Sequence, residues 1–171
     1  MARLENLLGA LALALTDRLA GAGPASLGPA SERAALVTLH AHTDQPVSWL
    51  GQVLGLTSSG VTRLVDRLEA AGWVTRAPGS DARSRRLTLS PAGRNQARVV
   101  LTARAEALAG AVHGLSEADR AEFERLLGLV LRGLPADVPG VLRVCRLCDR
   151  DACAADGSGC PLVDVGTGWD G

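Results

Sequence analysis

Residues 50–76 read LGQVLGLTSSGVTRLVDRLEAAGWVTR, and this stretch decides the fold. Its apolar residues recur at i, i+3, i+4 and i+7, the spacing of one buried helix face: Val61, Leu64, Val65 and Leu68. Thr57 is a good N-cap for this helix, and Gly72 is the residue expected just past its end. A short apolar helix that ends at Gly55 precedes it. The stretch therefore predicts two consecutive helices joined by a tight turn.

The opposite face of the second helix is small and polar, with two arginines. Its members are Ser58, Ser59, Thr62, Arg63 and Arg67. Two helices joined in this way, the second with such a face, describe a helix-turn-helix. Small hydroxyl residues allow a helix to enter a DNA major groove deeply, while arginines reach base edges or phosphates.

A β-hairpin is predicted directly after this helix. The alternating runs WVTRA and RRLTLS flank the connection PGSDARS, which carries an arginine at its tip. In this position the hairpin is the wing of a winged helix, and an arginine at its tip suits a narrow minor groove. A solvent-exposed basic turn is the alternative, and it would be preferred if no helix-turn-helix came before.

Further helices surround this lobe. One is predicted over residues 4–20, one after an N-cap at Ser31, one from Ser90-Pro91 to about residue 113, and one after an N-cap at Ser116. The terminal helices carry more apolar surface than a small winged helix covers. We expect a homodimer, because paired helix-turn-helix units read half-sites about 34 Å apart. Packing within a monomer is the alternative.

The distribution of charge along the sequence singles out the region of the predicted helix-turn-helix and hairpin. The 171 residues have a formal net charge of zero, and all eighteen basic residues are arginine. Arginine is in excess by five between residues 57 and 98, whereas aspartate is in excess by three from residue 137 onward. A nucleic-acid surface has this pattern, although a solvated charged face also does. The apolar run at residues 7–15 is too short to span a membrane and follows no basic segment, so a cytoplasmic protein is expected.

From about residue 4 to residue 134 the chain resembles the MarR family of bacterial transcription regulators. The resemblance is most specific in the stretch quoted above and in DARSRRLTLSPAGR at residues 81–94. It implies a mainly α, α+β winged-helix fold, with a dimer interface built from the terminal helices. It also implies that Arg83 enters the minor groove and that Asp81 orients the wing. We add Arg85 and Arg86 of the wing to the predicted DNA-binding residues.

The predicted organisation has two parts. Residues 1–134 form the winged helix and dimerisation helices, with the DNA-binding lobe at about residues 31–90, and residues 135–171 form a cysteine-rich extension. Family members that sense aromatic compounds have an aromatic-lined pocket, but this chain has no Tyr, one Phe and three Trp. His40 and His42 lie near the expected place of such a pocket, and we interpret them as structural. The small-molecule effector is not predicted.

All four cysteines lie in the extension, at Cys145, Cys148, Cys153 and Cys160. Permanent disulfides are disfavoured in a reducing cytosol. Reversible oxidation stays open, but it does not need four thiols so close together. Binding a metal in a four-thiolate site does need four thiols close together, and C-x2-C is a usual first half of such a site. Gly157 and Gly159 allow the turn that would return Cys160 to the others.

Zinc and an iron–sulfur cluster both remain candidates for this site. The wide second spacing and the Cys-Pro pair at residues 160–161 favour an iron–sulfur cluster slightly. Four thiolates around Zn²⁺ leave a net charge of −2, which Arg143, Arg146 and Arg150 offset. The site is either the sensory input of the regulator or a structural staple for a short segment.

The sequence thus predicts a non-enzymatic protein that binds double-stranded DNA as a homodimer and represses transcription from a pseudo-palindromic operator. Two alternatives come from other classes. One is a small redox or electron-transfer protein that works through the extension, although no catalytic triad or cofactor site is found in the body. The other is a metal-stapled protein-interaction module.

Overall fold

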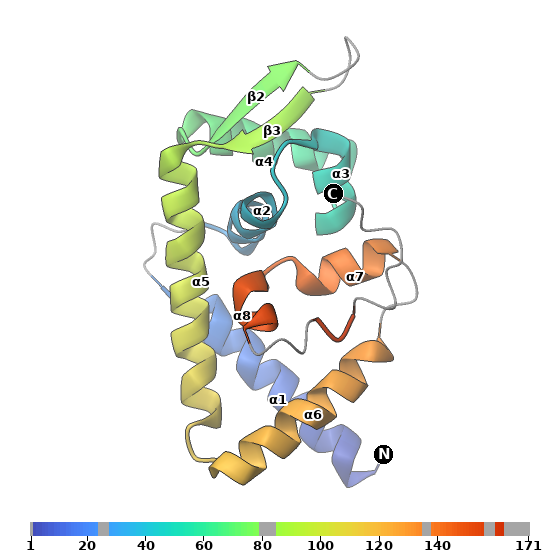
Figure 1. The fold of residues 1–171 in the computed structure, drawn as a ribbon. Coiled ribbons are helices and arrows are strands. Elements are labelled where there is room, and N and C mark those ends of the chain that lie inside the picture. The colour runs from blue at the N-terminus through green and yellow to red at the C-terminus, as the bar shows by residue number, and fades with distance from the viewer. Residues whose placement is uncertain (1, 24–27, 79–84, 135–137, 156–159, 163–171) are drawn as a thin grey trace.

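The computed structural model of the chain describes residues 2–23, 28–78, 85–134, 138–155 and 160–162. In chain order the elements are α1 (Arg3–Ala20), α2 (Ala30–Ala41), β1 (Gln45–Pro46), α3 (Val47–Leu54), α4 (Ser58–Ala70), β2 (Val74–Pro78), β3 (Arg85–Leu89), α5 (Pro91–Val112), α6 (Glu117–Arg132), α7 (Val138–Cys145) and α8 (Arg150–Ala154). The wing residues Asp81 and Arg83, and the glycines at 157 and 159, lie outside the described residues. The predicted mainly α winged-helix fold is confirmed (Figure 1).

The sheet is small and antiparallel, with strand order β1-β3-β2. β2 and β3 form the predicted hairpin, in which Val74 is opposite Leu89 and Arg76 is opposite Leu87. The buried residues alternate along β3, as expected for a strand with one face on the core. β1 was not predicted, because two residues that end in proline carry no strand pattern. It adds a third strand through the pairing of Gln45 with Leu87.

One hydrophobic core joins the helix-turn-helix to the sheet. The predicted stripe of α4 is fully inside it, with its four residues between 0% and 3% exposed. α2 contributes Leu36 and Leu39, α3 contributes Leu50, and the sheet contributes Leu87. Leu54 at the end of α3 is half-buried and packs against this core. The core fixes the orientation of α4, because one of its faces is committed to apolar contacts.

Capping residues set most helix ends as predicted. The hydroxyl oxygens of Thr57, Ser90 and Ser116 each accept a hydrogen bond from the backbone N–H three residues later. Gly72 has φ +72° just after α4, a conformation that favours glycine. The predicted cap at Ser31 is wrong. The N-cap is Pro29, two residues before Ser31, so α2 begins at Ala30 and has no side-chain cap.

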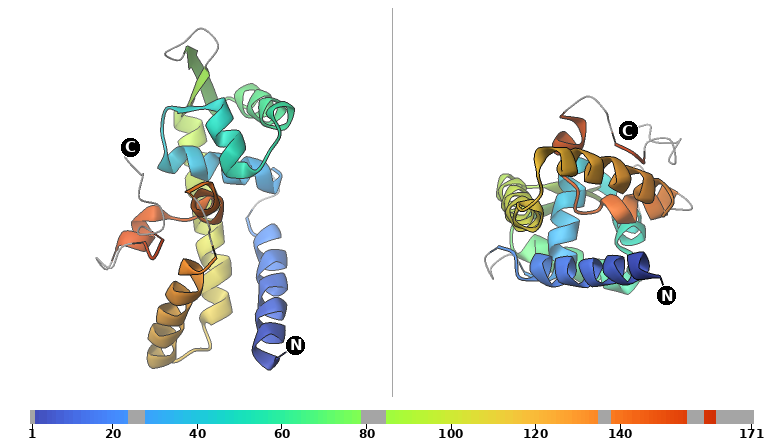
Figure 2. Two further views of the ribbon diagram at one scale, coloured as in Figure 1. Left: turned by 90° about the vertical axis from the view of Figure 1, so that its right-hand side faces the viewer. Right: turned by 90° about the horizontal axis from the view of Figure 1, so that it is seen from below.

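The long helix α5 connects the two ends of the molecule. Figures 1 and 2 show the wing at one end of α5, and α1 and α6 at the other. α1 and α6 contain no buried residue, although both are rich in leucine. Among the described helices we find none that combines the length and hydropathy needed to cross a membrane.

The extension folds back onto the winged-helix lobe. Figure 1 shows α7 alongside the lower part of α3, and Figure 2 shows α8 projecting to one side of the molecule. Val141 of α7 is buried, and Leu147 packs beside Val37 and Val100. The Thr38 hydroxyl donates a hydrogen bond of 3.2 Å to the Arg146 carbonyl. The cysteine segment is therefore attached to the winged helix rather than extended away from it.

Candidate nucleic-acid interface and cysteine cluster

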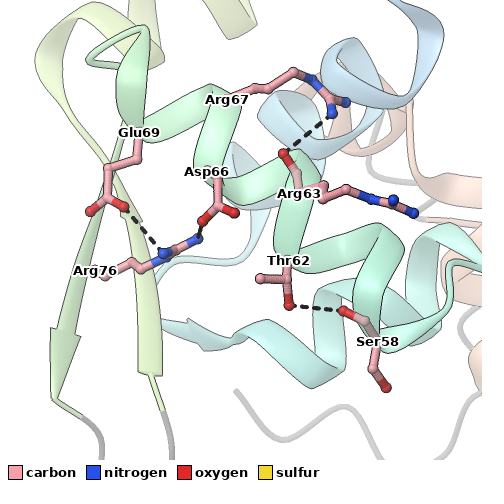
Figure 3. A network of polar contacts seen from close by, with 7 residues as sticks. All are labelled: Ser58, Thr62, Arg63, Asp66, Arg67, Glu69 and Arg76. Atoms are coloured by element: carbon pink, nitrogen blue, oxygen red, sulfur yellow. Dashed lines mark hydrogen bonds and ion pairs between the residues drawn. The ribbon is translucent and has the colours of Figure 1, made fainter.

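The exposed face of α4 is the centre of the candidate interface. All five residues predicted for this face are exposed: Ser58, Ser59, Thr62, Arg63 and Arg67. The Thr62 hydroxyl donates to the Ser58 carbonyl at 2.8 Å, so it lies along the helix and leaves a shallow surface (Figure 3). Such a surface allows close approach of the helix to another molecule.

The two arginines of this face differ in their contacts. Arg67 forms an ion pair with Glu32 of α2, with 2.7 Å between Nε and Oε1. It also donates a hydrogen bond to the Arg63 carbonyl, which Figure 3 shows. The Glu32 side chain is only 11% exposed, whereas that of Arg67 is 54% exposed. Arg63 is exposed and forms no ion pair with another described residue. Arg63 is thus the more available of the two for an external anion.

A second ion-pair group connects α4 to the wing. Arg76 of β2 lies 2.6 Å from Asp66 and 3.3 Å from Glu69, both on α4 (Figure 3). No sequence pattern predicted this group, because the partners come from different elements. It ties the helix to the hairpin, and its two carboxylates are among the three acidic residues already subtracted in the predicted excess of arginine.

The wing arginines point in different directions. Arg85 is exposed at the start of β3. Arg86 pairs with Asp44, at 2.7 Å between Nε and Oδ2, and also donates to the Asp44 carbonyl. Arg86 therefore holds β1 to the wing in this structure instead of facing outward. The structure does not place Asp81 and Arg83, which lie outside its described residues.

A wide groove of about 850 Å³ runs beside the start of α4. It is bordered by Ser58 and Thr62 of α4, by Arg85 of the wing and by α3. Arg143 of the extension also lines it. The Arg143 guanidinium approaches Gly55 in the turn so closely that a Cβ there would lie 3.1 Å from Cζ. The sequence assigned Arg143 to the cysteines, and nothing in the pattern indicated this contact.

The four cysteines influence one another electrostatically. We call Cys145, Cys148, Cys153 and Cys160 the cysteine cluster. A hydrogen bond with the Cys148 sulfur, burial and the other cluster thiolates raise the pKa of Cys145. The Cys145 hydrogen bond, and then Arg104, Arg150 and Arg146, lower the pKa of Cys148 to about 6 against the opposing effect of burial. Burial and neighbouring thiolates raise the pKa of Cys153.

The four cysteines lie in one region but are not arranged as a metal-coordination site. None of the four cysteines forms a disulfide bond. Within the described ranges, no three His, Cys, Asp or Glu side chains converge closely enough to hold a metal ion. The structure therefore brings the predicted ligands into one region, but it does not show a coordination site.

His42 is enclosed between α3 and the extension. Its ring lies edge-on to Trp49, with 5.2 Å between ring centroids. Burial, and then the charge of Arg150, lower the pKa of His42 to about 4. The ring is neutral near pH 7, in agreement with the structural interpretation of this residue.

The arrangement defines a winged-helix fold, with a polar α4 face, an adjacent wing and a connecting core. Residues 27–84, about a third of the chain, match the family model described as MarR family. This segment is a MarR-family winged helix, and the resemblance inferred from the sequence is confirmed.

Solved structures extend the similarity beyond that segment. A MarR family protein from Bacillus stearothermophilus is 28% identical, with a TM-score of 0.63 over 74% of this chain and 89% of that one. A probable transcriptional regulator from Pseudomonas aeruginosa is 26% identical, with a TM-score of 0.58 over 75% of this chain and 99% of that one. Wild-type MarR from E. coli, at 21% identity, has the same fold, with a TM-score of 0.62 over 77% and 98%. No curated protein matches the chain.

Proposed function

We propose that the protein is a transcription regulator that binds double-stranded DNA as a homodimer and represses a promoter carrying a pseudo-palindromic operator. The exposed, hydroxyl-rich face of α4 beside a wing carries this proposal. α4 would enter the major groove, with Arg63 contacting a phosphate or base edge, while the wing contacts the flanking minor groove. No enzymatic step is part of the proposal.

Apolar surface on the terminal helices supports the homodimer. A groove of about 690 Å³ between α1, α5 and α6 is lined by Leu11, Phe123 and Leu127. Large side chains on both terminal helices are exposed in the single chain: Leu4, Leu7, Leu8, Leu11, Leu126, Leu127, Leu129 and Val130. Exposed apolar surface of this extent marks an interaction site. The resemblance implies the same helices as the dimer interface, so a second copy of the chain is the proposed occupant.

The dimer is tested by two substitutions on one helix. Leu11 lines the groove, while Leu13 lies two positions further along α1, about 200° around the axis, and is 70% exposed. Leu11→Glu should give monomers in light scattering at micromolar concentration and should lose operator binding. Leu13→Glu should remain a dimer. Dimers of unchanged stability for both variants would contradict the proposed interface.

DNA binding is tested by fluorescence anisotropy with fragments from upstream of the protein's own gene. Binding should weaken steeply with salt, because arginine–phosphate contacts release counterions. Footprinting should show two protected half-sites about one helical turn apart. In vitro transcription from the bound promoter should fall as protein is added. An increase in transcript would overturn the repressor assignment, and absence of any specific fragment would overturn the function itself.

A further inference from the structure

We propose that the cysteine cluster binds one thiophilic metal centre, a zinc ion or an iron–sulfur cluster, whose binding fixes α7 against the helix-turn-helix. The proposed metal binding does not depend on the function proposed above. The proposed effect of the metal on operator affinity does rest on that function.

The local geometry already brings two of the proposed ligands, Cys145 and Cys148, close together. The Cys148 N–H donates to the Cys145 carbonyl at 2.9 Å, which closes a turn around the C-x2-C pair. Cys153 lies in α8, whose first turn is capped by the Asp149 carboxylate through bonds of 3.1 and 3.3 Å. The Cys145 and Cys148 sulfurs share a hydrogen bond, so the first two donors are already in contact. Four sulfur donors from one short segment are a ligand set for zinc or an iron–sulfur cluster.

The two ends of the segment are held by different parts of the body. Leu147, beside the first pair, packs with Val37 and Val100 of the DNA-binding lobe and α5. After Cys160, Leu162 is 2% exposed, and Pro161 lies against Gly128 of α6, where an added Cβ would be 3.9 Å away. The cluster therefore lies between the DNA-binding lobe and a helix of the terminal region.

Positive charge surrounds the cluster. Arg146 and Arg150 come from the extension itself, while Arg104 comes from α5, and all three lie close enough to Cys148 to interact with it electrostatically. Four thiolates around Zn²⁺ carry a net charge of −2, and a thiolate-bound iron–sulfur cluster is also anionic. Three nearby guanidinium groups offset that charge. Arg104 precedes the segment by about forty residues in the sequence, so it is the fold that brings it close to the cluster.

The extension is too small to hold itself together by burial alone. Among its described residues, only Val141 and Leu162 are buried hydrophobic side chains, and α8 has five residues. Isolated helices of this length are unstable in water. A metal centre supplies folding free energy directly to such segments. Since the sulfurs do not yet converge in the described arrangement, binding must draw them together and order the segment further.

α7 links the centre to the candidate interface. This helix ends at Cys145, and two residues before that Arg143 reaches the helix-turn-helix turn and the groove beside Ser58. Drawing the four sulfurs together would fix the end of α7. Fixing α7 holds the Arg143 guanidinium where a DNA phosphate would approach. Loss of the metal would release it.

The metal part is tested on the full-length protein purified under nitrogen. We expect either one zinc per chain without visible absorption, or iron with acid-labile sulfide and broad visible absorption. Cys148→Ser and Cys160→Ser should each lose most of the metal, and α7 should become more sensitive to proteolysis. Asp151→Asn, a neighbouring acidic residue that is exposed, is the matched control and should keep the metal. Protein with neither metal, in which added zinc does not slow alkylation of the four thiols, would overturn the proposal.

The coupling part compares loaded and metal-free protein on the same operator fragment. We expect metal removal to weaken binding roughly 5- to 150-fold, the usual range for coupled sites. Arg143→Ala should lower the slope of log K against log salt by about 0.9 for each protomer. Arg3→Ala, at the far end of α1, should leave it unchanged. Equal affinities of loaded and metal-free protein would overturn the coupling and leave the metal site intact. Failure of both forms to bind DNA would overturn the proposed function, which the metal analysis does not depend on.

Discussion

The difference between Arg63 and Arg67 gives the sharpest test of the interface. Both arginines are exposed on α4, but Arg67 is paired with the nearly buried Glu32 at 2.7 Å, whereas Arg63 has no ion pair with another described residue. Arg67→Ala removes the partner of a carboxylate that is only 11% exposed. Because Arg67 itself is half-exposed, we expect a loss of about 1–2 kcal/mol in the free energy of unfolding.

This loss corresponds to a fall in Tm of about 2–8 °C for a chain of this size. Arg63→Ala should change the free energy of unfolding by less than about 0.5 kcal/mol, as other exposed substitutions do. Adding Glu32→Gln to Arg67→Ala removes the unpaired charge and should restore most of the lost stability. Thermal unfolding at one fixed protein concentration measures all four proteins, because the Tm of a dimer depends on concentration.

Operator binding should show the reverse order. If Arg63 contacts one phosphate in each half-site, Arg63→Ala lowers the slope of log K against log salt by about 1.8 for the dimer. Between 50 and 200 mM salt, the unsubstituted protein should then lose roughly ten times more affinity than the variant. Arg67→Ala should have a smaller effect, since binding DNA would first require Arg67 to leave Glu32. Unchanged stability of Arg67→Ala, with a loss of affinity equal to that of Arg63→Ala, would refute the ion pair as a constraint on this face.

Two further predictions concern the scaffold and pH. At Gly93 an added Cβ would lie 2.0 Å from the Trp73 carbonyl oxygen, so Gly93→Ala should cost about 3 kcal/mol or more. Gly114→Ala, which meets nothing within 4 Å, should leave chemical denaturation almost unchanged, and equal midpoints for the two variants would contradict this packing. The pKa of His42 falls from 6.5 to about 4 on folding, so stability should be complete above pH 6.5 and decrease as pH falls toward 4. After allowance for the partial exposure of the ring, we expect the free energy of unfolding to fall by about 1–2 kcal/mol across that pH range. His42→Gln should flatten this pH dependence in unfolding curves measured over the same range.

Local signals account for what the sequence predicted correctly. Thr57, Gly72 and Ser90-Pro91 mark helix ends through contacts within a few residues, and the stripe of α4 follows from helix periodicity alone. The same signals failed at Ser31, where the preceding proline starts the helix without a side-chain cap. Such signals also predict which residues of α4 are exposed, because burial of one face exposes the other.

Contacts between distant residues account for what was missed. Arg67 and Glu32 are 35 residues apart, and Arg86 and Asp44 are 42 residues apart. A sequence pattern identifies each as a charged surface residue, but it does not say which partner the fold brings near. The approach of Arg143 to Gly55 depends in the same way on how α7 docks on α3. The sequence thus predicted the helix and the hairpin correctly, but it could not say which of their arginines are already paired with carboxylates.

These pairings change the meaning of the arginine excess in the lobe. Arg67 and Arg86 pair with Glu32 and Asp44, carboxylates outside residues 57–98, so the excess counted over that stretch overstates the unpaired positive charge. Arg76 pairs with Asp66 and Glu69, which the count already subtracts. Around the face and groove of α4, Arg63, Arg85 and Arg143 form no ion pair with another described residue. One of these three belongs to the cysteine-rich extension. Because few cations are available there, displacing one of them has a large relative effect on a salt-dependent interaction. A segment held by a metal centre is therefore well placed to change DNA affinity without any movement of α4 itself.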